Sequence, residues 1–294
     1  MLRLPRRLGV WPAALGLFAF TWLELVQPDR TTLAVLRVWA LAWFVLLVLG
    51  AILFGARWIG AADPFEAYAR SVAQLSPWRR VGDTLRLVNP LAGLTAWRPP
   101  PGAVGVVAAL LGGTAFDSFA NTSWWISTVQ SSDVVTVVWG TGGLAVMILV
   151  VGVTFAVAAG WMARYGDQPA HAYPRLMAGS VVPIVIGYAV AHYFTLLWAE
   201  GQRAAITLSD PLGRGWNVFG TAGMGVNTAL FAHPTVIALV QVVGILTGHV
   251  VGIVCAHERA AALLAPRHLL AGQWPMLLVM VGYSCAGLLL LFSP

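Results

Sequence analysis

The sequence has no lysine and little charge of either sign. Charged residues make up 10% of its 294 residues, whereas apolar residues make up 59%. Soluble domains carry about 25% charged residues, so this composition excludes an ordinary soluble domain. The seventeen basic residues are all arginine, and the mean hydropathy is +0.80. We therefore expect an integral membrane protein.

Cysteine is also scarce, with Cys255 and Cys285 as the two thiols. They fall at different depths of two expected membrane helices, too far apart for a disulfide bridge. A disulfide framework is therefore excluded, and both residues are expected to be buried packing residues.

Seven long apolar runs predict seven membrane-spanning helices, because a span needs about 20 consecutive apolar residues. The runs cover residues 10–26, 33–56, 103–125, 134–162, 176–199, 232–256 and 274–292. No cleavage signal accompanies the first run, so it is expected to be an anchor. These runs predict one all-α transmembrane domain over residues 1–294, in the plasma membrane.

The placement of arginine predicts the orientation of this bundle. With the N-terminus inside, thirteen arginines fall in inner segments, and the outer segments hold only Arg30, Arg37, Arg203 and Arg214. Positive charge is enriched on the cytoplasmic side of membrane proteins, so the N-terminus is expected inside and the C-terminus outside. The net charge of +6 therefore indicates contact with anionic lipid headgroups at the inner leaflet, and not a nucleic-acid partner.

Two segments between the runs are unusually long. In the inner segment 57–102, the spacing in Phe65–Leu75 and Val81–Val88 predicts short amphipathic helices on the cytoplasmic leaflet, with a solvated loop as the alternative. The outer loop 200–231 contains six glycines. It is expected to be either a lid, folded over the bundle through Trp216, Phe219 and Met224, or a mobile loop.

Asp117 is the one charged residue of the third run, 103–125. A carboxylate at such a depth is expensive and is usually kept for a partner, a metal or a proton. Thr114, Asp117 and Asn121 are spaced to form one stripe of a helix, which Trp124 continues to the outer interface. At 1.5 Å per residue, Asp117 is expected in the outer half of the membrane.

The fifth and sixth runs carry further polar residues. Tyr188, His192 and Thr195 repeat the helical spacing, and His192 is expected at the depth of Asp117. His233 lies at the outer mouth of the sixth run, with Gln241 and His249 successively deeper. Glycines at 244, 248 and 252 predict close approach of a neighbouring helix.

These residues allow three kinds of site. Asp117, His192 and His233 are a suitable ligand set for a divalent metal such as zinc or copper. Asp117 with His192 is also a suitable acid–base pair, or a purely structural hydrogen bond. A gap between the two side chains would favour metal, whereas direct contact would favour the hydrogen bond. The residues expected to line or support the site are Asn121, Tyr188, Glu200, Gln241 and His249.

Other chemistries fit the pattern less well. Haem of the b type needs two facing histidines at one depth. His249 has no such partner and is expected to be a core histidine with its hydrogen bonds made, while His192 with His233 is a marginal pair. A serine hydrolase is disfavoured because neither Ser118 nor Ser123 lies in a nucleophile-elbow motif.

Several segments resemble a family of multi-pass membrane proteins of high-GC actinobacteria that is commonly labelled fenitrothion hydrolase. The resemblance is carried by Phe116–Trp125, Tyr188–Gln202, Ser209–Ala222 and His233–Arg259, and it covers nearly the whole chain. It implies hydrolysis of a phosphorothioate ester. Such hydrolysis usually relies on metal-activated water.

The sequence therefore leaves four classes of function open. The first is a metal-dependent hydrolase at Asp117, His192 and His233. The second is a proton- or cation-coupled transporter or channel, against which the lack of a visible internal repeat and of a polar path below Gln241 both count. The third is a haem- or copper-binding redox accessory subunit. The fourth is a structural protein that binds a membrane partner through loop 200–231.

Overall fold

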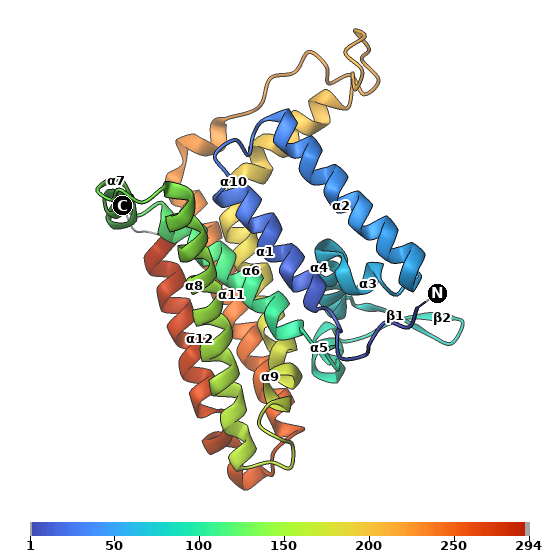
Figure 1. Ribbon diagram of the computed structural model, residues 1–294, viewed down its shortest axis with the longest axis vertical. Coiled ribbons are helices and arrows are strands. Elements are labelled where there is room, and N and C mark those ends of the chain that lie inside the picture. The colour runs from blue at the N-terminus through green and yellow to red at the C-terminus, as the bar shows by residue number, and fades with distance from the viewer. Residues whose placement is uncertain (1, 292–294) are drawn as a thin grey trace.

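The protein is a helical bundle with one small hairpin (Figure 1). The computed structural model describes residues 2–291. Its helices are α1 (Trp11–Leu25), α2 (Leu33–Phe54), α3 (Ile59–Ala62), α4 (Pro64–Val72), α5 (Pro90–Ala96), α6 (Ala103–Ala120), α7 (Ser123–Gln130), α8 (Thr136–Gly160), α9 (Ala172–Met177), α10 (Val182–Thr207), α11 (Pro234–Ala261) and α12 (Leu269–Leu291). Its strands are β1 (Trp78–Val81) and β2 (Thr84–Leu87).

Six of these helices are long and apolar enough to cross a membrane. They are α2, α6, α8, α10, α11 and α12, together with short extensions of some of them. The first apolar run forms α1, which has 15 residues. At 1.5 Å per residue α1 is about 22 Å long, shorter than a hydrocarbon core of about 30 Å. The all-α bundle with helices able to cross a membrane is thus confirmed, while the seventh span and the orientation stay predictions.

The third apolar run is not one continuous helix, as expected, but breaks after Ala120. Asn121 ends α6, and Thr122 starts α7 by accepting a hydrogen bond from the backbone N–H of Trp125 at 3.3 Å. A threonine at this position stabilises a new helix start because it satisfies a free N–H group. Trp124 therefore lies on α7 and does not continue the stripe of Asp117.

Close packing of α10 against α11 confirms the role expected for the glycine stripe. A Cβ atom at Gly187 would lie 2.4 Å from the carbonyl oxygen of Gly244, and one at Gly248 would lie 2.6 Å from that of Pro183. Such distances are below any normal contact, so only glycine lets the two backbones approach this closely. This contact sets the position of α10, which carries His192.

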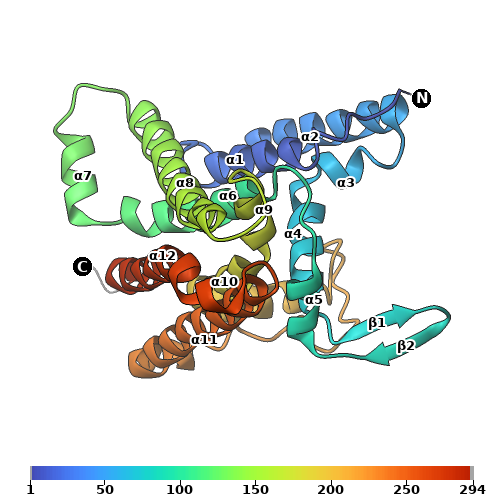
Figure 2. The same ribbon diagram turned by 90° about the horizontal axis from the view of Figure 1, so that it is seen from below.

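The predicted helix over Val81–Val88 is wrong, because this segment forms the antiparallel hairpin of β1 and β2. Gly82 and Asp83 form its two-residue turn, in which Gly82 has a φ of +62°. Turns of this kind favour glycine and fit the twist of a hairpin. The hairpin projects sideways from the bundle (Figure 2). The helix expected over Phe65–Leu75 is present as α4, followed by a short 3-10 turn.

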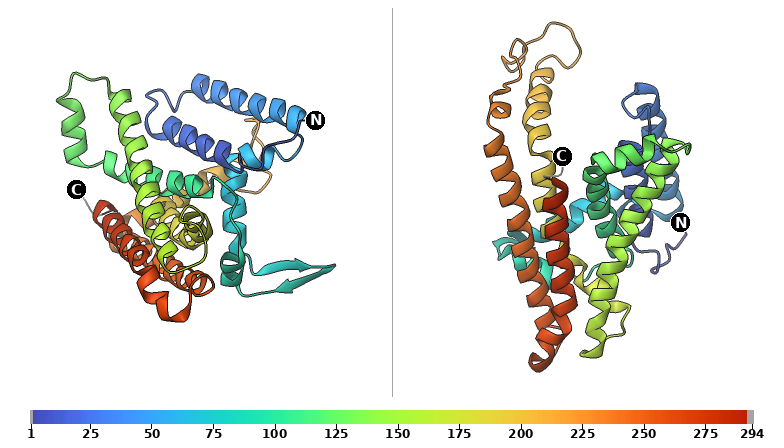
Figure 3. Two further views of the ribbon diagram at one scale, coloured as in Figure 1. Left: turned by 60° about the horizontal axis from the view of Figure 1, so that its bottom comes forward. Right: turned by 90° about the vertical axis from the view of Figure 1, so that its left-hand side faces the viewer.

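The loop after α10 is shorter than expected, since α10 continues to Thr207. Gln202 holds the end of the loop by hydrogen bonds to both the N–H and the carbonyl of Asn227. Trp216, Phe219 and Met224 are 44%, 68% and 61% exposed. The loop therefore folds onto the end of α10 and extends beyond the bundle (Figures 1 and 3), away from the position expected of a lid.

Candidate functional site

A cavity of about 290 Å³ lies between α1, α4, α6 and α10. Its wall is mostly apolar and aromatic, and its polar groups come from α1, α4, α6 and α10. The residues lining it are Leu17, Phe20, Thr21, Glu24, Leu25, Phe65, Tyr68, Leu110, Gly113, Thr114, Asp117, Val185, Ala189 and Tyr193. Asp117 thus faces a cavity, as expected of a carboxylate that is kept for function.

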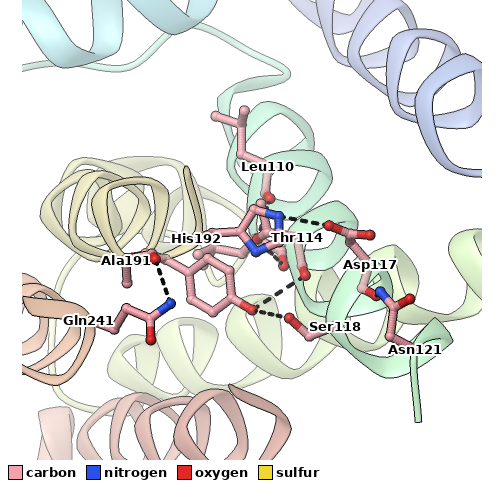
Figure 4. Close-up of polar contacts among 10 residues, drawn as sticks. Leu110, Thr114, Asp117, Ser118, Asn121, Ala191, His192 and Gln241 are labelled. Atoms are coloured by element: carbon pink, nitrogen blue, oxygen red, sulfur yellow. Dashed lines mark hydrogen bonds and ion pairs between the residues drawn. The ribbon is translucent and has the colours of Figure 1, made fainter. Parts of the chain in front are cut away.

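Asp117 and His192 are in direct contact beside this cavity (Figure 4). Nε2 of His192 lies 2.7 Å from Oδ2 of Asp117, and the two side chains are 23% and 26% exposed. The prediction that the two residues share one depth is therefore confirmed. Because no gap separates them, the geometry is that of an acid–base pair or a hydrogen bond and not of two ligands around an ion.

Glu24 is a second carboxylate of the site, and the sequence interpretation missed it. It interacts electrostatically with both Asp117 and His192, and the hydroxyl of Tyr193 lies within hydrogen-bonding reach of it. The signal was present, because Glu24 is the one charged residue of the apolar run 10–26, just as Asp117 is in its own run. The site thus combines two carboxylates with one imidazole.

Tyr188 connects α10 to α6 next to the pair. Its hydroxyl lies 2.7 Å from Oγ of Ser118 and 3.4 Å from the carbonyl oxygen of Thr114. The ring of Tyr188 stacks on the imidazole of His192 with centroids 6.0 Å apart. Since Ser118 bonds to Tyr188, it is not the partner of His192 that a serine hydrolase would need. Tyr188 instead holds the imidazole in place.

The other residues expected to support the site take different positions. Nδ2 of Asn121 donates to the backbone carbonyl of Asp117 at 2.7 Å and so bonds to its main chain. Nε2 of Gln241 donates to the backbone carbonyl of Ala191 at 3.1 Å and joins α11 to α10. Glu200 forms an exposed ion pair with Arg203 at 3.2 Å, outside the cavity. None of these three side chains lines the cavity.

His233 does not join Asp117 and His192. It is exposed and immediately precedes α11, eight residues before Gln241. Because Gln241 bonds to the residue next to His192, eight helical residues place His233 about 12 Å beyond the level of the pair. Within residues 2–291, no three His, Cys, Asp or Glu side chains are arranged to hold a metal. The predicted metal-ligand set is therefore not assembled.

His249 is buried, as expected, but only one of its ring nitrogens is bonded. Nδ1 lies 2.9 Å from the carbonyl oxygen of Ile245, one turn earlier in α11. Nε2 is buried and has no hydrogen-bond partner among the described residues. The expectation of a core histidine with its hydrogen bonds made is thus wrong for one of the two nitrogens. His249 also lies apart from the cavity at Asp117.

The electrostatic character of the cavity is acidic. Glu24 and Asp117 outnumber His192, and no basic side chain lines the cavity within residues 2–291. Tyr68, which α4 contributes from the long inner segment, has a pKa raised by burial, so its hydroxyl stays neutral. The arrangement can hold a proton on the pair or attract a cation.

No family model, no curated protein and no solved structure matches the chain. The resemblance to the actinobacterial family accordingly stays a prediction.

Proposed function

We propose that this protein is a proton-coupled transporter of a small organic cation. The observation that carries the proposal is the direct contact of Asp117 with His192, beside Glu24 and an apolar cavity. Ionisable groups inside membrane bundles typically mark the paths of protons and ions. In this proposal the Asp117–His192 pair binds a proton, and the cation replaces that proton when it enters.

The balance of charge supports a cationic solute. With His192 protonated, Glu24, Asp117 and His192 together carry one net negative charge, and after a singly charged solute replaces the proton the two carboxylates and the solute carry the same net charge. The exchange therefore keeps the charge of the cavity unchanged, whereas loss of the proton without entry of a cation would leave a buried carboxylate unpaired, which costs several kcal/mol. An anionic solute would add a third negative charge and is excluded by the same argument.

The shape of the cavity supports a small solute with an apolar body. A volume of about 290 Å³ lies at the lower end of ligand pockets, and Phe20, Phe65 and Tyr68 line it. Aromatic rings attract cations through the faces of their π systems. A compact ammonium ion with an aromatic or alkyl group fits these walls.

The position of the cavity answers one argument against transport. The sequence shows no polar path below Gln241 on α11, but the cavity lies on the other side of α10, beside α1 and α4. Tyr68 and Phe65 of α4 belong to the inner segment 57–102 and line it. In the proposal the solute leaves along α4 toward the inner side.

Uptake into proteoliposomes tests this function. The probe is radiolabelled phenyltrimethylammonium, which carries a permanent charge and an apolar ring, and the drive is an imposed pH gradient. We expect uptake by the unmodified protein and a loss of about tenfold or more in Asp117→Asn and Glu24→Gln, equivalent to about 1.4 kcal/mol. Glu200→Gln is the matched control, because Glu200 lies outside the cavity. Uptake at the unmodified rate in both cavity variants would exclude the proposal.

Hydrolysis is the second candidate, favoured by the carboxylate that orients His192. A histidine held in this way acts as a general base on water. Together with the resemblance to the actinobacterial family, a general base at His192 supports a phosphorothioate ester as the substrate. The test is release of nitrophenol from a nitrophenyl phosphorothioate triester, compared with His192→Gln. Equal rates in both proteins would end this candidate.

For the membrane arrangement we propose seven crossings, with the N-terminus inside and the C-terminus outside the plasma membrane. The excess of arginine in the inner segments supports it. In this arrangement α1 crosses as a short helix, as a chain does where the bilayer is locally thin.

A further inference from the structure

A second cavity lies on the far side of α10 from the first one. It has a volume of about 370 Å³ and shares no lining residue with the cavity at Asp117. Its wall comes from α6, α8, α10, α11 and α12. The side chains that matter here are His249, Tyr188 and Tyr283, and the rest of the wall is apolar or small.

The hydroxyl groups of the two tyrosines are already engaged. Tyr283 donates to the carbonyl oxygen of Val151 at 2.8 Å and contacts Oγ1 of Thr154 at 2.7 Å. Tyr188 bonds to Ser118, as described above. Among the described residues, Nε2 of His249 is the one buried side-chain nitrogen or oxygen without a partner. His249 itself is 5% exposed.

The bond at Nδ1 determines what Nε2 can do. A carbonyl oxygen only accepts, so Nδ1 carries the hydrogen that bonds to Ile245. Among apolar neighbours the ring is neutral, because an unpaired buried charge is costly. Nε2 therefore presents a lone pair and needs a hydrogen-bond donor. An unpaired buried acceptor is unfavourable, and a ligand with a donor would relieve it.

The cavity opens toward the side of the bundle. Val150 of α8 and Leu289 of α12 line it and are 50% and 71% exposed. Neighbouring side chains on these two helices, Val146 and Val281, are also exposed and apolar. In a membrane this side faces hydrocarbon, so a ligand would enter from the bilayer and not from water.

We infer that this second cavity binds a membrane-soluble alcohol, whose apolar body fills the space between α8 and α12 and whose hydroxyl donates to Nε2 of His249. An isoprenoid alcohol has this chemistry. An ordinary acyl chain would fill the space but leave Nε2 unpaired. The inference is independent of the function proposed for Asp117.

Competition in lipid nanodiscs tests this site. The protein is cross-linked with a diazirine derivative of farnesol. Two unlabelled competitors of this cross-link are compared: farnesol itself and farnesyl methyl ether, which has the same apolar body but no hydrogen-bond donor. We expect cross-links to residues of the cavity and about tenfold stronger competition by farnesol. In His249→Phe this preference should disappear, and in His249→Gln, which keeps an acceptor, it should persist.

Gly287→Leu provides the second variant. A Cβ at Gly287 would lie 3.6 Å from the ring of Tyr188, which is an ordinary contact, so leucine adds bulk to the wall of the cavity and leaves the His249 side chain itself unaltered. We expect it to abolish the cross-link while the protein keeps its thermal stability. Equal competition by farnesol and its ether in the unmodified protein would overturn the role of His249. A cross-link that survives Gly287→Leu would overturn the cavity as the binding site.

Discussion

At the scale of single residues, the contact between Asp117 and His192 is the main feature of the site. Its length of 2.7 Å means that each side chain satisfies the other in a place where most of both is shielded from solvent. Glu24 adds a second carboxylate next to the pair. The pair therefore has both a structural effect, because it joins α6 to α10, and a chemical one.

The structural effect of the pair can be measured by a double-mutant cycle. Asp117→Ala, His192→Ala and the double variant are unfolded in detergent, and the free energies of unfolding are compared. We expect a coupling of about 1 kcal/mol, as for hydrogen bonds between membrane helices. The exposed pair of Glu200 and Arg203 is the control, with an expected coupling of roughly 0.3 kcal/mol. A coupling near zero for Asp117 and His192 would contradict the contact.

Whether the site binds a metal also depends on the positions of single side chains. The facing atoms of Asp117 and His192 are at hydrogen-bonding distance, and His233 lies elsewhere. We expect elemental analysis to find the same sub-stoichiometric zinc and copper in the unmodified protein and in His192→Ala. One equivalent of metal that disappears in the variant would show that the pair opens around an ion.

At the scale of elements, the packing of α10 on α11 depends on glycine. The gap between the two backbones leaves no room for a Cβ at Gly187 or Gly248. Interiors are packed densely, so a side chain that does not fit forces the helices apart. Any such shift moves His192 relative to Asp117, because His192 belongs to α10 and Asp117 to α6.

Gly187→Ala tests this dependence. We expect it to lower the free energy of unfolding by about 1–3 kcal/mol through overpacking. Gly142→Ala is the matched control, since a Cβ there meets no atom within 4 Å, and the better helix propensity of alanine stabilises it by up to about 1 kcal/mol. Thermal unfolding of both variants in detergent is the measurement. Equal stabilities would mean that α10 and α11 are free to separate.

At the scale of the whole molecule, the number of crossings determines on which sides the two termini lie. Seven crossings place them on opposite sides, whereas six place them on the same side. The six long helices alone do not decide between the two, because α1 is short. The arginine distribution favours seven.

Reporter fusions at the C-terminus test the topology. Alkaline phosphatase is active only outside the cytoplasm. Green fluorescent protein fluoresces when it stays in the cytoplasm and is dark when the general secretion route exports it. We expect an active phosphatase fusion and a dark fluorescent one. A fluorescent fusion with inactive phosphatase would overturn the arrangement of seven crossings with the N-terminus inside.

The sequence alone determined the class and much of the site. Apolar runs must form helices in a membrane, because every backbone polar group needs an internal partner there. Asp117, the one charged residue of its apolar run, predicted the site. The rise of 1.5 Å per helical residue then predicted that His192 lies at the same depth. The glycine stripe of α11 likewise predicted close helix packing. These predictions depend only on the residues within each segment, and they hold whichever helices pack beside it.

Only the tertiary structure decided what surrounds these residues. Whether Glu24 or His233 lies beside Asp117 depends on which helices pack together and on their rotation, and periodicity does not specify either. The segment around Gly82 forms a hairpin and not a helix, because the turn at Gly82 stabilises paired strands more than the amphipathic pattern stabilises a helix. The unpaired Nε2 of His249 arises from the packing of five helices, and no property of its own helix predicts it.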